Sequence, residues 1–214
     1  MYILRDLFSV KSIPYFDAQH FLAKDVRDAV LELQPWLNDL IAAWEIYLTV
    51  GGFPAAVNGY LASGDVPDWF VQSLWQVIVG EAILGTRATE GRTQQLLSLL
   101  SEALGTPLNV TNVGRDMALD WHTTHARVQA LVEAYVCWIC HAITKTGEPT
   151  PGSPAKVYFT DPLFARLAHL RNPQVVPAPE ASKITEQQLG FALSQQLARA
   201  DEYHDFSMFA RTAT

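Results

Sequence analysis

Three short helical segments followed by two β-forming segments constrain the fold of this chain most. Apolar residues recur at helical spacing in the helical segments, which span residues 94–104, 108–119 and 120–135. β-branched and aromatic residues are frequent in the other two segments, residues 136–143 and 156–160, and a Gly- and Pro-rich loop at residues 147–154 separates them. A helix-turn-helix followed by a hairpin is the order of elements in a winged helix.

Residues at the ends of these helices fit that prediction. Gly105 follows the first helix and favours its termination, because glycine adopts the left-handed backbone that ends many helices. Asn109 or Thr111 is predicted to cap the second helix, and Asp120 the third, because their side-chain oxygens accept hydrogen bonds from free N–H groups.

The third helix is predicted to turn one face inward. The inward positions lie within about 80° of one another on a helical wheel and are Thr124, Val128, Leu131, Val132 and Tyr135. The opposite face carries His122, His125, Ala126, Gln129 and Glu133, with Arg127 on its flank. If this helix enters a DNA major groove, the predicted contacts are His122, Thr123, His125, Arg127 and Gln129.

The charge of this region argues against DNA. Residues 92–136 hold three arginines and four carboxylates, which gives a net charge of -1. Duplex affinity comes largely from Lys and Arg side chains that replace counterions on the phosphates. We therefore expect a structural or protein-contact role for the winged helix, with DNA binding as the alternative.

The rest of the chain is predicted to be mostly helical. Before the winged helix, the expected helices span residues 23–33, 36–50 and 69–84. The helix at 36–50 is expected to end at Gly51-Gly52-Phe53-Pro54. The helix at 69–84 is expected to be capped by Asp65, with Pro67 in its first turn. After it, a helix begins at Asp161, a capping box at residues 185–188 opens another helix, and residues 206–211 form a last strand. The fold class is thus mostly α (α+β). The expected parts are a helical N-terminal part (residues 1–88), the winged helix (89–161) and a truncated α/β element (162–214).

Composition limits the function classes. Only 17% of the 214 residues are charged, 49% are hydrophobic and 11% aromatic, so either the core is large or apolar surface meets a partner. A formal net charge of -7 opposes nucleic-acid binding by bulk charge. Arg5 and Asp6 interrupt the N-terminal apolar residues and no stretch reaches about 18 apolar residues, so we expect a cytoplasmic protein without membrane contact.

Two short patterns have both a chemical and a structural interpretation. The pattern C-x-x-C-H, formed by Cys137, Cys140 and His141, is that of a haem attachment site. Its C-x-x-C part is also the pattern of a redox dithiol. In a strand the two cysteines would point to opposite faces, so we expect two buried thiols instead. His122 and His125 share a helix face without a neighbouring carboxylate, and we predict surface histidines and no metal site.

Four stretches carry a resemblance to a known family: residues 47–57 (YLTVGGFPAAV), 111–119 (TNVGRDMAL), 131–135 (LVEAY) and 154–161 (PAKVYFTD). In order and spacing they resemble the C-terminal domain of unknown function that follows the ATPase module in many bacterial and archaeal AAA-type ATP-binding proteins. The resemblance extends from about Ala43 to Arg211. It implies an ATP-binding half before this region and a nuclease-like α/β fold after the winged helix.

This chain departs from what the resemblance implies about catalysis. No G-x-x-x-x-G-K-[S/T] phosphate loop is present, so we expect no ATP binding. A nuclease needs clustered carboxylates to hold a divalent metal ion. Ser194 stands where the family commonly carries Glu, and residues 209–212 align with a strand that leads into an acidic motif that this sequence does not contain. We expect no catalytic residues, no cofactor and no enzyme activity.

The resulting hypothesis is a non-catalytic C-terminal interaction or regulatory module of an AAA-type ATPase. It would couple a missing ATP-binding half to a protein partner or to a second copy of the chain. The alternative is a DNA-binding winged-helix regulator, and a metal or thiol enzyme comes third.

Overall fold

The computed structural model describes residues 26–86, 88–142 and 155–199. This part of the chain is mostly helical with one two-stranded sheet, which confirms the predicted class. The elements in chain order are α3 (Val26–Glu32), the 3-10 helix η1 (Gln34–Trp36), α4 (Leu37–Val50), α5 (Pro54–Ser63), α6 (Asp68–Thr86), α7 (Glu90–Glu102), α8 (Val110–Asp116), α9 (Trp121–Glu133), β1 (Cys137–Cys140), β2 (Lys156–Phe159), α10 (Pro162–Arg171) and α11 (Ala181–Arg199).

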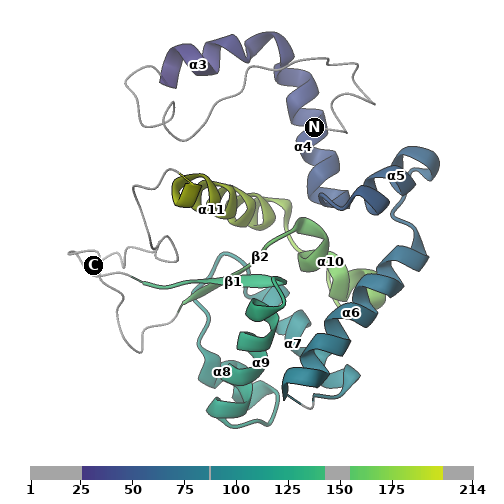
Figure 1. Cartoon of the computed structure of the whole chain (residues 1–214), viewed down its shortest axis with the longest axis vertical. Coiled ribbons are helices and arrows are strands. Elements are labelled where there is room, and N and C mark those ends of the chain that lie inside the picture. The colour runs from purple at the N-terminus through teal and green to yellow at the C-terminus, as the bar shows by residue number, and fades with distance from the viewer. Residues whose placement is uncertain (1–25, 87, 143–154, 200–214) are drawn as a thin grey trace.

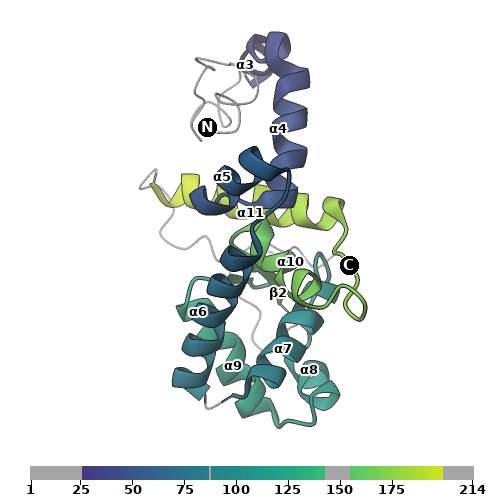
Figure 2. The same cartoon turned by 90° about the vertical axis from the view of Figure 1, so that its right-hand side faces the viewer.

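The helices α7, α8 and α9 gather at one end of the molecule, and α3 with the start of α4 lies at the other end (Figures 1 and 2). The long helix α6 packs against α9 and α7, and α10 packs against α7, α4 and α6. Most of α10 is buried, including Leu163, Ala165 and Leu167 at 0% exposure. One hydrophobic core therefore runs from α4 through α10 to the three-helix end.

The predicted caps of α8 and α9 are present. The Asn109 side chain accepts a hydrogen bond from the Thr111 N–H at 2.9 Å, and Asp120 Oδ1 accepts one from the Thr123 N–H at 2.9 Å. Each bond pairs an N–H that the first helical turn leaves without a backbone partner. These local features were predictable because donor and acceptor lie two or three residues apart.

Some caps and helix starts were predicted wrongly. The helix α6 begins at Asp68, next to the predicted residue 69, but the side chain of its predicted cap Asp65 accepts from the N–H of Val66. The helix α7 begins at Glu90, four residues earlier than predicted, with Thr89 as its cap. The helix α11 begins at Ala181, so the predicted capping box lies inside it. The strand predicted at residues 206–211 lies outside the described residues.

The inward face of α9 is largely as predicted. Thr124, Val128 and Leu131 are at most 2% exposed. Tyr135 was wrongly placed on this face, since α9 ends at Glu133 and Tyr135 is 82% exposed with φ at +56°. A left-handed residue turns the chain here, and this turn directs it from the helix into β1.

The strands β1 and β2 form an antiparallel hairpin, with Cys137 opposite Phe159 and Cys140 opposite Lys156. The other edge of β2 is covered by side chains of α11. Gln187 Oε1 accepts from the Phe159 N–H at 3.0 Å, and Gln188 Nε2 donates to the Phe159 carbonyl at 3.1 Å. The two amide side chains thus occupy the hydrogen-bonding positions of a neighbouring strand.

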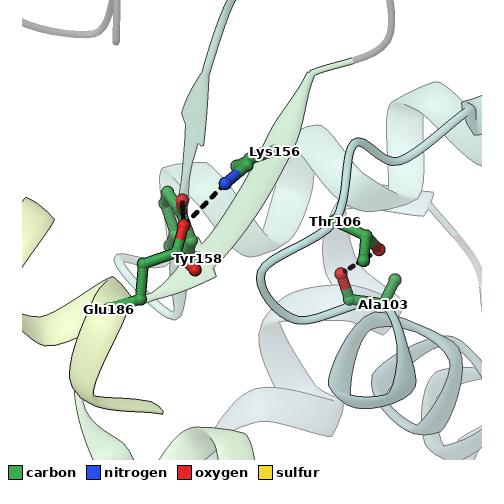
Figure 3. Close-up of polar contacts among 5 residues, drawn as sticks. All are labelled: Ala103, Thr106, Lys156, Tyr158 and Glu186. Carbon is green, nitrogen blue, oxygen red and sulfur yellow. Dashed lines mark hydrogen bonds and ion pairs between the residues drawn. The ribbon is translucent and has the colours of Figure 1, made fainter. Parts of the chain in front are cut away.

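A carboxylate strengthens the contact between α11 and the hairpin. Glu186 Oε1 accepts hydrogen bonds from Lys156 Nζ at 2.6 Å and from the Tyr158 hydroxyl at 2.7 Å (Figure 3). Burial raises the pKa of Glu186. The two hydrogen bonds and the positive charge of Lys156 lower it, and together they outweigh burial, so the pKa lies below the ordinary value. Glu186 is therefore an ionised anchor of α11 at neutral pH.

Candidate interaction site

The N-terminal arm, which we define as residues 26–42, extends from the body of the molecule (Figures 1 and 2). It consists of α3, η1 and the first turns of α4. None of its described side chains is buried, and among the residues whose burial is described the first buried one is Ala43. The arm therefore contributes little to the hydrophobic core.

The arm nevertheless carries large apolar side chains in contact with water. Those at least half exposed are Val30, Leu31, Leu37 and Ile41, with exposed fractions of 50 to 55%. Leu37 and Ile41 are four residues apart on α4 and share one helix face. Apolar surface in water is unfavourable by roughly 25 cal/mol per Å², so this face would gain free energy by contact with another surface.

The base of the arm is held firmly. The Trp44 indole N–H donates to Thr185 Oγ1 at 3.4 Å, and the Tyr47 hydroxyl donates to Gln188 Oε1 at 2.8 Å. Burial, and next the charge of Asp161, raise the pKa of Tyr47 above its ordinary value, so the hydroxyl stays protonated and donates. The second half of α4 is thereby fixed to α11, and this anchoring orients the arm.

A hollow of about 300 Å³ lies at the foot of the arm. It is lined by Glu45, Leu48, Thr49, Arg166, Ala178, Pro179, Ala181 and Ile184. Glu45 follows the exposed Ile41 by one helical turn, so the apolar face of the arm leads into this hollow. Arg166 Nη1 donates to the Thr49 carbonyl at 2.6 Å and closes one side.

Two of the four stretches that carry the family resemblance, residues 47–57 and 154–161, meet in space. Asp161 Oδ2 accepts from the Gly52 N–H and Asp161 Oδ1 from the Leu163 N–H, both at 2.8 Å. Removal from water raises the pKa of Asp161, an effect that these two hydrogen bonds oppose. We call this contact the motif junction. It joins the start of α10 to the turn after α4, which is a structural role.

The motif junction requires a glycine. Gly51 has φ at +77°, and a Cβ atom at this position would lie 2.2 Å from Asp161 Oδ1. No side chain fits between the turn and the carboxylate. The Gly-Gly pair in the sequence is therefore explained by the close approach of Asp161, 109 residues away in the chain.

The predicted DNA-contact residues lie in different environments. His122 and His125 are exposed and pack on Trp121, with the His125 ring stacked at 4.8 Å between centroids. Thr123 Oγ1 donates to Asp120 Oδ2 at 2.6 Å and so belongs to the helix cap. Gln129 is half-buried. The structure thus brings His122 and His125 together around Trp121, a residue that the sequence reasoning did not single out.

Arg127, predicted on the flank of this outward face and as a DNA contact, is buried, with only 9% of its surface exposed. At 100° per residue Arg127 stands between the two faces, so its orientation depends on the helices around it. On the described part of α9, the outward face holds no lysine or arginine.

The two cysteines are buried as predicted, each at 1% exposure on β1. Burial raises the pKa of the Cys137 thiol to about 12. Within the described residues, no three His, Cys, Asp or Glu side chains gather in a way that would hold a metal ion. No single described helix is long and apolar enough to cross a membrane, and η1–α4 with α5 pass that test only as a pair bent by 109°.

Comparison with known proteins gives one match. A protein-family profile described as "Domain of unknown function (DUF8612)" matches residues 41–174, which is more than half of the chain. No curated protein and no solved structure matches this chain. The matched range contains the motif junction and the three-helix end but excludes most of the N-terminal arm and all of α11.

Proposed function

The chain belongs to the family of the domain of unknown function DUF8612, and on that premise we propose that it is a non-catalytic protein-interaction module. In this proposal it couples an ATP-binding half of AAA type to a protein partner. Helices α7 to α9 and the β1–β2 hairpin form a winged helix with a structural or protein-contact role. The partner binds at the N-terminal arm.

The exposed apolar face of the N-terminal arm carries this proposal. Side chains of the size of Leu37 and Ile41 are usually buried, and a cluster of them on a surface marks an interaction site more often than a monomeric surface. Short helices without tertiary contacts are marginal in water, so a partner surface would also stabilise α3. The anchored base at Trp44 and Tyr47 supplies the rigid support that a docking surface needs.

The link to AAA-type proteins rests on the resemblance of two stretches that meet at the motif junction. The stretches that resemble that family, residues 47–57 and 154–161, contact each other through Gly52 and Asp161. In this chain the contact has a structural role, so the proposed link to that family carries no catalytic role into it.

Site-specific photocrosslinking tests the interaction proposal. We expect a photoreactive benzoylphenylalanine in place of Ile41 to give a discrete crosslinked product in the cells that make the protein. The matched control is the same replacement at Val77, which is 61% exposed on α6 and lies outside the arm. The same reaction on purified protein reports whether the partner is a second copy.

Comparison of the crosslinks at Ile41 and Val77 tests whether the arm is an interaction site. A discrete product at Ile41 with none at Val77 supports an interaction site on the arm. Equal products at both positions, or no product at Ile41, would contradict the proposal, because each result would mean that the arm has no preferred partner.

DNA binding is the second candidate, and the aromatic cluster of Trp121, His122 and His125 is the observation in its favour. Exposed aromatic rings on the third helix are available for contact with bases or sugars. The electrostatics oppose it, because the only arginine of α9 is buried and Glu133 is exposed. Without cations on the outward face, phosphate contacts are weak.

A gel-shift titration at two salt concentrations separates the two candidates. We expect no duplex to bind more tightly than about 100 μM near physiological salt, the weak end of non-specific binding. A DNA regulator would instead bind tightly and lose about 0.9 log units of affinity per log unit of salt for each phosphate neutralised. Tight and salt-sensitive binding that Trp121→Ala weakens would favour the second candidate.

A further inference from the structure

Arg127 presents a buried charge without a visible partner. Its side chain extends from α9 into the three-helix end and is 9% exposed. The Nε and Nη1 atoms are enclosed and make no hydrogen bond. Buried polar groups in proteins are almost always hydrogen-bonded, so these two enclosed donors are available to an acceptor that reaches them.

Arg92 is close enough for its positive charge to act on Arg127. Arg92, in the first turn of α7, donates from Nη1 to the Met117 carbonyl and to Gln95 Oε1. Burial, and next the positive charge of Arg92, lower the pKa of Arg127. Within residues 26–86, 88–142 and 155–199 no carboxylate forms an ion pair with either arginine. The two positive charges therefore repel each other, and neither is paired with a carboxylate of the described residues.

We propose that Arg92 and Arg127 form a binding site for a dianionic phosphate group. A phosphomonoester or free phosphate carries nearly two negative charges at neutral pH and several strong acceptor oxygens. It would balance both guanidiniums and accept from the Nε and Nη1 donors of Arg127, an arrangement that guanidinium geometry favours.

The two positive charges and the burial of Arg127 favour a small dianion over other anions. A carboxylate carries one negative charge and would leave one of the two arginines unbalanced. A DNA backbone phosphate is also a monoanion, and a duplex is too wide to reach a side chain that is 9% exposed. A small phosphate or the end of a flexible phosphorylated group meets both requirements. This site is separate from the N-terminal arm, so it stands independently of the proposed function.

Titration with inorganic phosphate tests the proposal. We follow thermal unfolding and the arginine side-chain N–H signals in NMR at constant ionic strength, with chloride replaced by phosphate. For a dissociation constant on the order of 1 mM, 50 mM phosphate is expected to raise the Tm by about 5 °C. The Arg127 Nε signal is expected to shift and saturate over the same range.

Two variants separate specific binding from the general stabilising effect of phosphate on proteins. Arg127→Met removes the enclosed donors and is expected to abolish the saturable response, whereas Arg115→Gln, at an exposed arginine of α8, is expected to keep it. If Arg127→Met does not fold, the saturable Nε shift of the native chain decides the question alone. Equal responses in the native chain and Arg127→Met, or no saturable shift in the native chain, would overturn the proposal.

The source of the phosphate is distinguished by further titrations on the native chain. O-phosphoserine and inorganic phosphate are both expected to shift the Arg127 signal, because each carries a dianionic phosphate. Duplex DNA at the same phosphate concentration is expected to leave it unchanged. A shift with DNA and none with free phosphate would overturn the assignment to a dianion.

Discussion

Replacing Gly51 by alanine is expected to lower the free energy of unfolding by about 3 kcal/mol or more. The new Cβ atom would cost about 1 to 3 kcal/mol, because a backbone with φ at +77° and ψ at −171° is essentially limited to glycine. It would also stand 2.2 Å from Asp161 Oδ1, so the carboxylate must move. That movement weakens the hydrogen bonds that it accepts from Gly52 and Leu163, each worth about 1.5 to 3 kcal/mol for an ionised acceptor.

Gly64→Ala is the matched control for this change. Gly64 shares the positive φ, at +80°, although its ψ of 5° lies in the left-handed helical region and the ψ of Gly51 is −171°. Nothing lies within 4 Å of a Cβ added at Gly64. Its cost is expected to be the backbone strain alone, about 1 kcal/mol. Urea unfolding measures both variants. If they lose the same stability, the motif junction contributes nothing beyond glycine's conformational freedom, and its structural role is refuted.

The thiol of Cys137 is expected to react about a thousandfold more slowly with a thiol reagent in the native protein than in denaturant at pH 8. The thiolate is the reactive form, and burial raises the pKa of this thiol to about 12. At 1% exposure the reagent also has no direct access. The measurement uses Ellman's reagent on Cys140→Ala, so that a single thiol is followed.

Denaturant supplies the reference rate for the same thiol in an open chain. A thousandfold difference supports the structural interpretation of the C-x-x-C-H pattern. If the native and denatured rates agree, Cys137 is accessible, and the dithiol and haem interpretations regain support.

The features that sequence predicted correctly depend on nearby residues. Asn109 and Asp120 cap their helices through N–H groups two and three residues away, so no knowledge of the tertiary structure was needed. The inward position of Val128 and Leu131 follows equally from helical periodicity. The mostly helical class rests on such local signals.

The features that were missed depend on contacts between distant residues. Arg127 lies near the boundary of the two faces of α9, and its burial depends on the packing of α6 and α8 against this helix. The contact between Gly51 and Asp161 joins two recognised stretches, but nothing in either stretch indicates that they touch. The start of α11 at Ala181 was missed because residues 181–184 carry no capping pattern as clear as that at residues 185–188.

The arm could be suspected from composition but not located. An excess of apolar residues predicts either a large core or exposed apolar surface, and both are present. Leu37 and Ile41 have the same helical spacing as core residues, so periodicity alone assigns them to the interior. Their exposure follows from the direction of α4, which the contacts of Trp44 and Tyr47 fix.

The amide side chains of α11 have a consequence for where this domain is taken to end. The family match stops at residue 174, whereas Gln187 and Gln188 pair the N–H and C=O of Phe159, which lies inside the matched range. A protein shortened to the matched range would leave that strand edge open. Open strand edges pair with strands of other molecules and lead to aggregation. The cooperative folding unit thus extends at least through α11, and expression of the domain for biophysical work should include it.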